Sequence, residues 1–94
     1  MASHIIKMYY VYILESLKDN RFYIGYTQNN PVTRLGKHND GSVSSTKLRR
    51  PLKLIYFEAY LNQSDALGRE KFLKSGSGHR FIKKQLNNYL AKNE

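Results

Sequence analysis

Residues 9–27 read YYVYILESLKDNRFYIGYT, two segments rich in aromatic and β-branched residues that flank a short polar turn. Residues 9–16 are almost continuously apolar, which is typical of a strand buried on both of its faces. Residues 22–27 again favour β-structure, and the polar residues between the two segments can form the turn of a hairpin. The sequence therefore predicts an antiparallel hairpin whose first strand is central to a sheet.

The register of this hairpin determines which tyrosines lie together. If the loop has an even number of residues, even positions of the first strand share a face with odd positions of the second. Tyr10 and Tyr12 would then lie on the same face as Tyr23 and Gly25. Composition singles out none of the eight tyrosines, because most tyrosines of a small sheet protein pack in the core with their hydroxyl groups in water.

Outside the hairpin, capping residues and apolar periodicity indicate further elements. These are a helix over residues 31–38 that begins after Asn30, a strand over 52–60, a helix over 65–75 capped by Ser64, a break at 76–78 and a last helix over 79–92. The order predicts an α+β fold, with a small three-stranded antiparallel sheet flanked by about three helices.

The length and charge of the chain restrict its organisation and its partners. Ninety-four residues suffice for one core, and we expect the domain at 9–90, an N-terminal extension or cloning remnant at 1–8 and a tail at 91–94. Sixteen Lys and Arg against seven Asp and Glu give a net charge of +9, which favours polyanionic partners. Nucleic acid is therefore the expected partner of a monomer or weak homodimer.

Several classes of protein are excluded by what the sequence lacks. The chain has no Cys, and its three His residues do not have the spacing of zinc ligands. No apolar run approaches the roughly 18 to 20 residues of a membrane span, and the first residues lack the apolar stretch of a signal peptide. We therefore expect a cytoplasmic protein without structural zinc.

Glu70 is unusual because it would lie on the apolar face of its helix. Ala66, Leu67 and Leu73 are three or four positions away, which places them on the same side as Glu70. A carboxylate in such a place can pair with a basic neighbour such as Arg69, Lys71 or Lys74, or it can bind a hard divalent cation. Both interpretations fit the sequence.

Arg34 and His38 are four residues apart and share a face of the first predicted helix, beside its stripe of Val32 and Leu35. The two side chains can point into a cleft together. A solvated helix flank is the commoner location of such a pair.

Basic residues gather in two groups that can neutralise phosphates, Lys47, Arg49 and Arg50 in a loop and Arg80, Lys83 and Lys84 on one side of the last predicted helix. Asn87 would lie on the basic side of that helix, whereas Asn88 would point away from it. Either group can also be an ordinary solvated surface.

Four motifs occur in order along the chain: Tyr10-Val11-Tyr12, Tyr23-Ile24-Gly25, Arg34-x-x-x-His38 and Arg69-Glu70-Lys71. Together they resemble the GIY-YIG nuclease domain, in particular the small single-domain members related to the nuclease domain of the bacterial excision-repair excinuclease. The resemblance spans the predicted domain. It implies a metal-dependent endonuclease that hydrolyses phosphodiester bonds in nucleic acid, and it favours DNA over RNA as the substrate.

The resemblance also implies a role for each residue of the motifs. Tyr12 and Tyr23 would be active-site phenols. Arg34 would contact the scissile phosphate, and His38 would transfer or orient a proton. Glu70 would be the ligand of one Mg²⁺ or Mn²⁺ ion.

Asn87, rather than Asn88, is our choice for the Asn that completes the family site. The chain departs from the family pattern at Tyr10, where the family has Gly. The spacing between Tyr23 and Arg34 is also one residue longer than usual, which predicts a bulge or a longer loop before the first helix.

In the mechanism that these residues suggest, Tyr12, aided by His38 or a water molecule, helps to deprotonate the attacking water, while Arg34 and the metal held by Glu70 neutralise the developing charge. Nearby positive charge would have to lower the pKa of Tyr12 from its usual value near 10. Two other interpretations are a non-catalytic nucleic-acid-binding module with the same fold and a protein-interaction adaptor.

Overall fold

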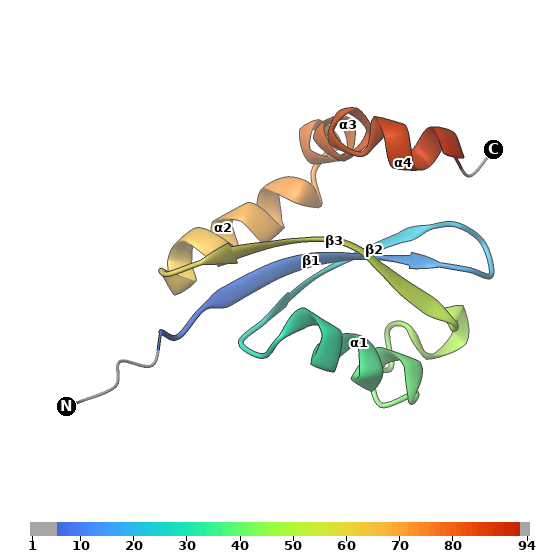
Figure 1. Ribbon diagram of the computed structural model, residues 1–94, viewed down its shortest axis with the longest axis horizontal. Helices are drawn as coiled ribbons and strands as arrows, with labels where there is room; N and C mark the ends of the chain where they lie inside the picture. Colours follow the sequence, from blue (N-terminus) through green and yellow to red (C-terminus); the bar gives the residue numbers. More distant parts are fainter. Residues whose placement is uncertain (1–5, 93–94) are drawn as a thin grey trace.

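The computed structural model describes residues 6–92 and contains one antiparallel sheet of three strands (Figure 1). Its strands are β1 (Tyr9–Ser16), β2 (Phe22–Thr27) and β3 (Leu52–Tyr60), arranged in the order β2-β1-β3. The three predicted strands and the central position of the first are confirmed. β1 is buried from Val11 to Ser16, as expected for a strand covered on both faces.

The register of the sheet confirms the predicted arrangement of the tyrosines. Tyr12 lies opposite Gly25, and Leu14 lies opposite Tyr23, so these four side-chain positions share one face. On the other side of β1, Tyr12 lies opposite Phe57. A shift in the β1–β3 register between Ile13 and Leu14 marks a bulge near the middle of the sheet.

Helices cover both faces of the sheet (Figure 1). α1 (Pro31–Asn39) lies on one face and is followed by the 3-10 helix η1 (Lys47–Arg49). α2 (Gln63–Leu73), α3 (Gly76–Gln85) and α4 (Asn87–Lys92) lie on the other. The α+β class is therefore confirmed.

Local hydrogen bonds explain the limits and the position of α1. The Asn30 side chain accepts a hydrogen bond from the Val32 amide at 2.8 Å, so the predicted cap is confirmed. At the other end, the Asn39 amide group donates to the Leu52 carbonyl at 2.9 Å and accepts from the Leu52 amide at 2.8 Å. These two bonds hold the end of α1 against the start of β3.

The prediction for the start of α2 was wrong by two residues. The helix begins at Gln63, and its cap is Asn62, whose side chain accepts a hydrogen bond from the Asp65 amide at 3.2 Å. Ser64 lies inside the first turn. Two capping residues stand two positions apart in the sequence, and only the geometry of the preceding strand end decides between them.

The predicted break at residues 76–78 is instead the first turn of α3. Ser75 caps this helix by accepting a hydrogen bond from the Gly78 amide at 3.1 Å. A Cβ atom at Gly78 would lie 2.0 Å from the Phe72 carbonyl oxygen. Glycine is therefore required here because the start of α3 packs directly on the end of α2.

The last predicted helix, residues 79–92, is two helices. α3 ends at Gln85 with Leu86 as its cap, and α4 begins at Asn87. The Tyr89 hydroxyl donates a hydrogen bond to the Glu15 carboxylate at 2.6 Å, which ties α4 to β1. This long-range contact accompanies the break between α3 and α4, and the helical periodicity of the sequence does not reveal it.

Two hydrophobic cores form, one on each face of the sheet. The larger one, under α2 and α3, contains buried Val11, Ile13, Ile24, Ala66, Leu73 and Ile82. The smaller one, under α1, contains Tyr12, Leu14 and Leu52, with Tyr23, Leu35 and Leu54 packed against it. Tyr12 is thus both a core residue and one of the candidate site residues in the sequence motifs.

Ordered structure continues through Lys92 in α4, two residues beyond the expected domain limit. The predicted extension at 1–8 lies mostly outside the described residues, and so does half of the predicted tail at 91–94. Within residues 6–92, no helix is both long and apolar enough to cross a membrane. The cytoplasmic location stays a prediction.

Candidate active site

The hydroxyl group of Tyr12 lies where β1 and α1 meet. Its oxygen is 2.8 Å from His38 Nε2, and Arg34 Nε donates a longer hydrogen bond of 3.4 Å to it. The residue is almost fully buried, with 1% of its surface exposed. One phenol, one imidazole and one guanidinium group are therefore assembled around a single oxygen atom.

Gly25 makes room for this arrangement. A Cβ atom at Gly25 would lie 2.4 Å from both Cζ and the hydroxyl oxygen of Tyr12. The Tyr12 ring therefore crosses the neighbouring strand at a position where no side chain fits. This contact explains why the third residue of the Tyr23-Ile24-Gly25 motif is a glycine.

The side chains of Arg34 and His38 point from α1 toward the sheet and do not lie on a solvated flank of the helix. His38 is fully buried and Arg34 is half-buried, whereas Val32 is 65% exposed. The expected packing stripe of Val32 and Leu35 was therefore wrong for Val32. Val32 lies outside because the helix packs through Pro31, Leu35 and the two polar residues.

His38 is held by hydrogen bonds at both ring nitrogens. Nε2 faces Tyr12, and Nδ1 is 2.7 Å from the hydroxyl oxygen of Thr46. Its ring also packs edge-on against Tyr23, with 5.0 Å between ring centroids. Burial, followed by the positive charge of Arg34, lowers the pKa of His38 from 6.5 to about 4. The imidazole is therefore neutral at physiological pH.

The pKa of Tyr12 is raised, so Arg34 alone does not provide the lowering of this pKa that the suggested mechanism requires. Burial is the largest cause, and it outweighs the hydrogen bond and the charge of Arg34, which lower the pKa. Tyr23 and Glu70 add to the rise. Tyr12 is consequently a neutral phenol unless another group accepts its proton.

Tyr23 completes one wall of this site. It is half-buried on β2, and its ring lies 6.3 Å from the Tyr12 ring, measured between centroids. The sequence correctly placed both phenols on the same face. Because Tyr23 is only half-buried, part of its side chain can contact a substrate bound beside Tyr12.

Glu70 lies on α2, close enough for its charge to affect the pKa of Tyr12. Its carboxylate forms an ion pair with Lys74 at 3.1 Å. Its side chain is 20% exposed, as expected for the partly buried carboxylate that the sequence indicated. The predicted pairing with a basic neighbour is therefore present, and the metal role stays a prediction.

No group of three or more His, Asp or Glu residues within the described chain is arranged to hold a metal ion. Glu70 would therefore contribute a single carboxylate to any ion bound beside Tyr12. Such a sparse site is compatible with Mg²⁺, which commonly binds through one or two carboxylates and retains water and phosphate oxygens as its other ligands.

Asn87 and its neighbour Asn88 are exposed at the start of α4. α4 lies on the side of the sheet opposite to α1, the same side as α2 with Glu70, so its side alone does not decide whether Asn87 reaches the site (Figure 1). None of the hydrogen bonds among residues 6–92 joins Asn87 to Tyr12 or Glu70. The argument that placed Asn87 on a basic helix face assumed one continuous helix and was wrong, and its role in the site stays a prediction.

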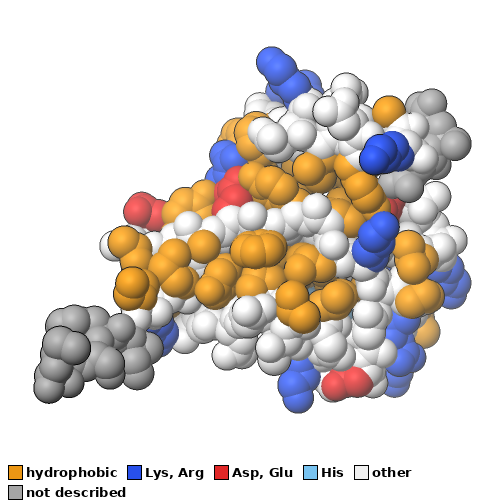
Figure 2. All heavy atoms as spheres, in the orientation of Figure 1, with side chains coloured by type: hydrophobic (Ala, Val, Ile, Leu, Met, Phe, Trp, Pro, Cys, Tyr) orange, Lys and Arg blue, Asp and Glu red, His pale blue; other side chains and the backbone are white. Residues whose placement is uncertain are grey.

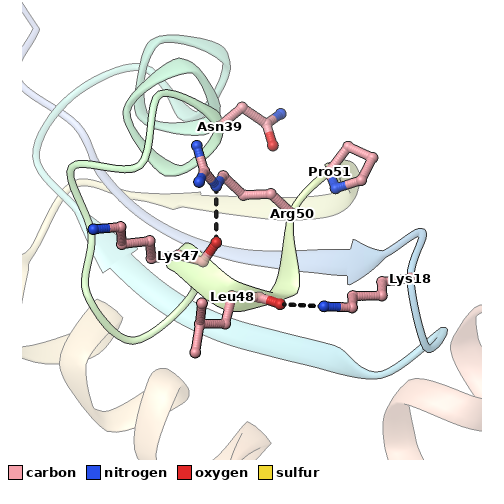
Figure 3. Close-up of a pocket in the computed structure, with 6 residues that line it drawn as sticks. All are labelled: Lys18, Asn39, Lys47, Leu48, Arg50 and Pro51. Carbon is pink, nitrogen blue, oxygen red and sulfur yellow. Dashed lines mark hydrogen bonds between the residues drawn. The ribbon is translucent and has the colours of Figure 1, made fainter.

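The first basic group divides into exposed and structural members. Lys47 and Arg50 are exposed and line a shallow pocket of about 490 Å³ with Lys18, Asn39, Leu48 and Pro51 (Figure 3). Arg49 instead donates a hydrogen bond to the Phe22 carbonyl at 3.1 Å, and its own carbonyl accepts one from Ser16. Arg49 therefore joins η1 to the sheet.

The second basic group lies across the sheet from the first. Arg80, Lys83 and Lys84 are exposed on α3, and Arg80 donates a hydrogen bond to Ser77 at 3.0 Å. Lys and Arg side chains lie at the margins of the face seen in Figure 2, around a central band of hydrophobic side chains. On this face the positive charge is therefore spread along the margins and does not form a single stripe.

Thr46 is a residue of the site that the sequence did not indicate. It is fully buried at the end of a Ser-rich loop and contacts His38 Nδ1. A single threonine among serines carries no local signal, and its partner is eight residues away. Only the folded loop brings them together.

The model of the GIY-YIG catalytic domain matches residues 8–89, nearly the whole described chain. The chain belongs to the GIY-YIG family. Its order of strands and helices and its Tyr12, Tyr23, Arg34 and Glu70 positions are those on which the resemblance rests. The family is one of nucleases, and a nucleic acid is the substrate that this membership indicates.

Small bacterial GIY-YIG relatives are similar over most of their length. A UPF0213 protein of Pediococcus pentosaceus is 42% identical over 88 residues, covering 89% of this chain and 90% of the relative. A UPF0213 protein of Staphylococcus haemolyticus is 41% identical, covering 88% and 94%. One from Clostridium perfringens is 44% identical over 71% of each chain.

Proposed function

We propose that this GIY-YIG protein is an endonuclease that hydrolyses phosphodiester bonds in DNA with the help of one Mg²⁺ or Mn²⁺ ion. One observation carries the proposal: the Tyr12 hydroxyl lies 2.8 Å from His38 Nε2 and accepts a hydrogen bond from Arg34. The family membership and the net charge of +9 support a polyanionic substrate.

Arg34 is the residue of this site suited to bind the scissile phosphate. Its guanidinium group is permanently charged and can pair with two phosphate oxygens. Because Arg34 also contacts Tyr12, a phosphate bound to it would lie beside the phenol. Arg34 would then stabilise the charge that develops on the phosphate during attack.

Tyr12 and His38 are suited to move a proton away from the attacking water. The raised pKa of Tyr12 opposes a stable phenolate, so the phenol must lose its proton as it receives one. In this step the water proton goes to the Tyr12 oxygen, and the Tyr12 proton goes to His38 Nε2. Burial and, second, the charge of Arg34 lower the pKa of His38 and oppose its protonation, and the bound phosphate would offset the charge of Arg34.

Glu70 is the residue that would hold the divalent cation. When bound, Mg²⁺ or Mn²⁺ supplies Lewis-acid stabilisation of the phosphate and leaving oxygens. Lys74 would have to release the Glu70 carboxylate for this to happen. Lys74 is exposed enough to do so at little cost, because exposed ion pairs contribute about 0 to 1 kcal/mol.

A non-catalytic nucleic-acid-binding module is the second candidate function. The Glu70–Lys74 ion pair favours it, because a carboxylate neutralised by a lysine needs no metal ion. In this alternative the positive surface would bind nucleic acid, and the Tyr12 cluster would be structural. The two candidates differ in whether Mg²⁺ supports strand cleavage.

The deciding experiment is cleavage of labelled duplex, branched, flapped and single-stranded DNA and RNA with Mg²⁺ or Mn²⁺. Glu70→Ala and Arg34→Ala should each lower the cleavage rate by at least about 100-fold while leaving the fold intact. Asp65→Asn on α2 and Arg21→Ala in the β1–β2 turn are matched controls of the same charge types and should cut normally.

The outcome of this panel separates the two functions. Metal-dependent cutting of DNA that both active-site variants lose supports the endonuclease, and cutting of RNA alone would replace DNA as the substrate. Salt-sensitive binding without any cutting by the wild-type protein would favour the binding module. Measuring the mass in solution by light scattering tests the expected monomer or weak homodimer.

A further inference from the structure

The loop between α1 and η1 sends one side chain into the site. Ser44 and Ser45 are exposed, but Thr46 is fully buried. Its amide donates a hydrogen bond to the Val43 carbonyl at 3.1 Å, and its carbonyl accepts one from the Arg49 amide at 2.9 Å. The Thr46 hydroxyl is thus held between the Val43 carbonyl, at 3.4 Å, and His38 Nδ1, at 2.7 Å.

Hydrogen-bond donors and acceptors in this cluster can be arranged in two ways. A neutral imidazole has one N–H donor and one bare nitrogen that accepts. If Nδ1 carries the proton, it donates to Thr46, and the Thr46 hydroxyl donates to Val43. Nε2 then accepts from Tyr12, whose oxygen accepts from Arg34. Every donor in this series of hydrogen bonds has an acceptor.

The opposite tautomer leaves one donor unsatisfied. If Nε2 carries the proton, the Tyr12 oxygen receives hydrogen bonds from both His38 and Arg34. The Tyr12 hydrogen then has no acceptor among the contacts of the described residues. A buried donor without a partner is costly, so the first arrangement is favoured.

We infer that Thr46 is a positioning residue that fixes the His38 tautomer, so that Nε2 is kept bare as the acceptor for the Tyr12 proton. Its hydroxyl can accept from Nδ1–H because the Val43 carbonyl, 3.4 Å away, is an acceptor for the hydrogen of this hydroxyl. The inference rests on the proposed nuclease function for its catalytic meaning, but the tautomer itself is a property of the resting protein.

Thr46 also faces the charge that His38 acquires. When His38 receives the Tyr12 proton, its Nδ1–H bond points at the Thr46 oxygen, whose dipole is aligned by Val43. The other groups that face the imidazole are Tyr12, Tyr23 and Arg34. None of these three is a carboxylate, so Thr46 supplies the oxygen that takes the place of the carboxylate often found behind a catalytic histidine.

The first test reads the tautomer directly by long-range ¹H–¹⁵N correlation NMR of the imidazole groups at neutral pH. Spectra of His38→Asn identify the His38 signals among those of the three histidines. Wild type and Thr46→Ser, which keeps the hydroxyl, should show Nδ1–H. Thr46→Val, which has the same shape without the hydroxyl, should shift His38 toward Nε2–H or a mixture.

The second test compares cleavage by the same variants. Thr46→Val should lower kcat on the order of tenfold with little change in KM, because it removes one hydrogen bond behind the proton acceptor. Thr46→Ser should restore most of kcat. Ser45→Val, which changes the exposed neighbour, should behave like wild type in both tests.

Two results would overturn the inference: an Nε2–H tautomer in the wild type, or a folded Thr46→Val variant with unchanged tautomer and kcat. If Thr46→Val does not fold, the wild-type and Thr46→Ser spectra still decide. A protein with the Nδ1–H tautomer that cuts nothing would refute the proposed function while the structural role of Thr46 stands.

Discussion

The ring of Tyr12 lies across the backbone of Gly25 on the neighbouring strand, so closely that a single added methyl group would meet it at 2.4 Å. The contact links the two tyrosine motifs of the sequence, because the first supplies the phenol and the second supplies the space for it. The same contact directs the Tyr12 hydroxyl to His38 and Arg34. Gly25, which has no side chain, therefore sets the position of the Tyr12 phenol.

Gly25→Ala should therefore impair both stability and cleavage. The added methyl group must displace the Tyr12 ring, which is packed in the smaller core, and overpacking of this kind costs about 1 to 3 kcal/mol. Urea denaturation should give a lower free energy of unfolding, and kcat of the folded protein should fall at least about tenfold.

Gly36→Ala is the matched control. This glycine lies on the exposed side of α1 with no atom within 4 Å of an added Cβ. Alanine favours a helix over glycine by about 0.5 to 1 kcal/mol, so the variant should be as stable as wild type or more stable, with normal kcat. Equal loss in both variants would show that the Tyr12 contact is not the cause.

The buried neutral His38 should make stability depend on pH between about 6.5 and 4. The unfolded chain binds a proton at His38 below about pH 6.5, whereas the folded protein does so only below about pH 4. The free energy of unfolding should therefore fall as the pH drops through this window, by up to about 3 kcal/mol, and this contribution should stop changing below it.

The pH effect is measured as a difference between two proteins. Denaturation curves of wild type and His38→Gln should be recorded at closely spaced pH values. The carboxylates titrate in both, so their effects cancel in the difference. Parallel stability curves across the whole window would mean that His38 is not held neutral by the fold.

Arg69 should be needed for folding and not for cleavage, unlike Arg34. Its guanidinium group donates two hydrogen bonds to Glu58, at 2.9 and 3.0 Å, and stacks on Phe81 with 4.3 Å between its carbon and the ring centroid. Burial tends to raise the pKa of Glu58, but the hydrogen bonds of Arg69 and two tyrosines outweigh it and lower the pKa. Arg69→Met should therefore destabilise the protein by about 2 to 3 kcal/mol.

A double-mutant cycle provides the control for this ion pair. Glu58→Gln combined with Arg69→Met should be less destabilised than the sum of the single variants, with a coupling of about 1 to 3 kcal/mol. Each folded variant should cut with a normal rate. A rate loss comparable to that of Arg34→Ala would place Arg69 in the site instead.

The basic residues around η1 should separate into binding and structural members. Lys18 and Lys47 are exposed beside the pocket of Figure 3. If each contacts a phosphate, replacing one by Ala should reduce the slope of log affinity against log salt by about 0.7 to 0.9, as measured by fluorescence anisotropy. Arg49→Ala should instead lower stability and leave the slope unchanged, because its guanidinium group is bonded to the sheet.

The sequence was sufficient for the sheet because its signals are local. A continuous apolar run marked β1, aromatic and β-branched residues marked β2, and a turn taken as even-numbered predicted the register that brings Tyr12 and Tyr23 together. The α1 cap at Asn30 was equally local. These features depend on residues that are neighbours in the chain or one hairpin apart.

The sequence was insufficient where distant contacts decide the structure. The burial of Gly78 against Phe72 turned an apparent break into a helix start, and the Tyr89–Glu15 hydrogen bond accompanies the change of direction after Leu86. The pKa of Tyr12 is raised because burial outweighs the hydrogen bond and charge of one arginine. Neither the effect of burial on the pKa of one phenol nor a hydrogen bond between distant elements can be read from spacing.

The smaller core beneath α1 contains the chemical groups of the site, since Tyr12 packs there with Leu14 and Leu52. A genetic screen of this protein will therefore not distinguish substitutions in this core that remove a site residue from substitutions that unfold the protein. Substitutions at Leu35 or Leu54 would displace Tyr12 without touching a substrate, whereas the buried residues of the larger core on the other face do not pack against Tyr12. A lineage of such proteins is expected to diversify through α3 and α4 before it changes the packing under α1.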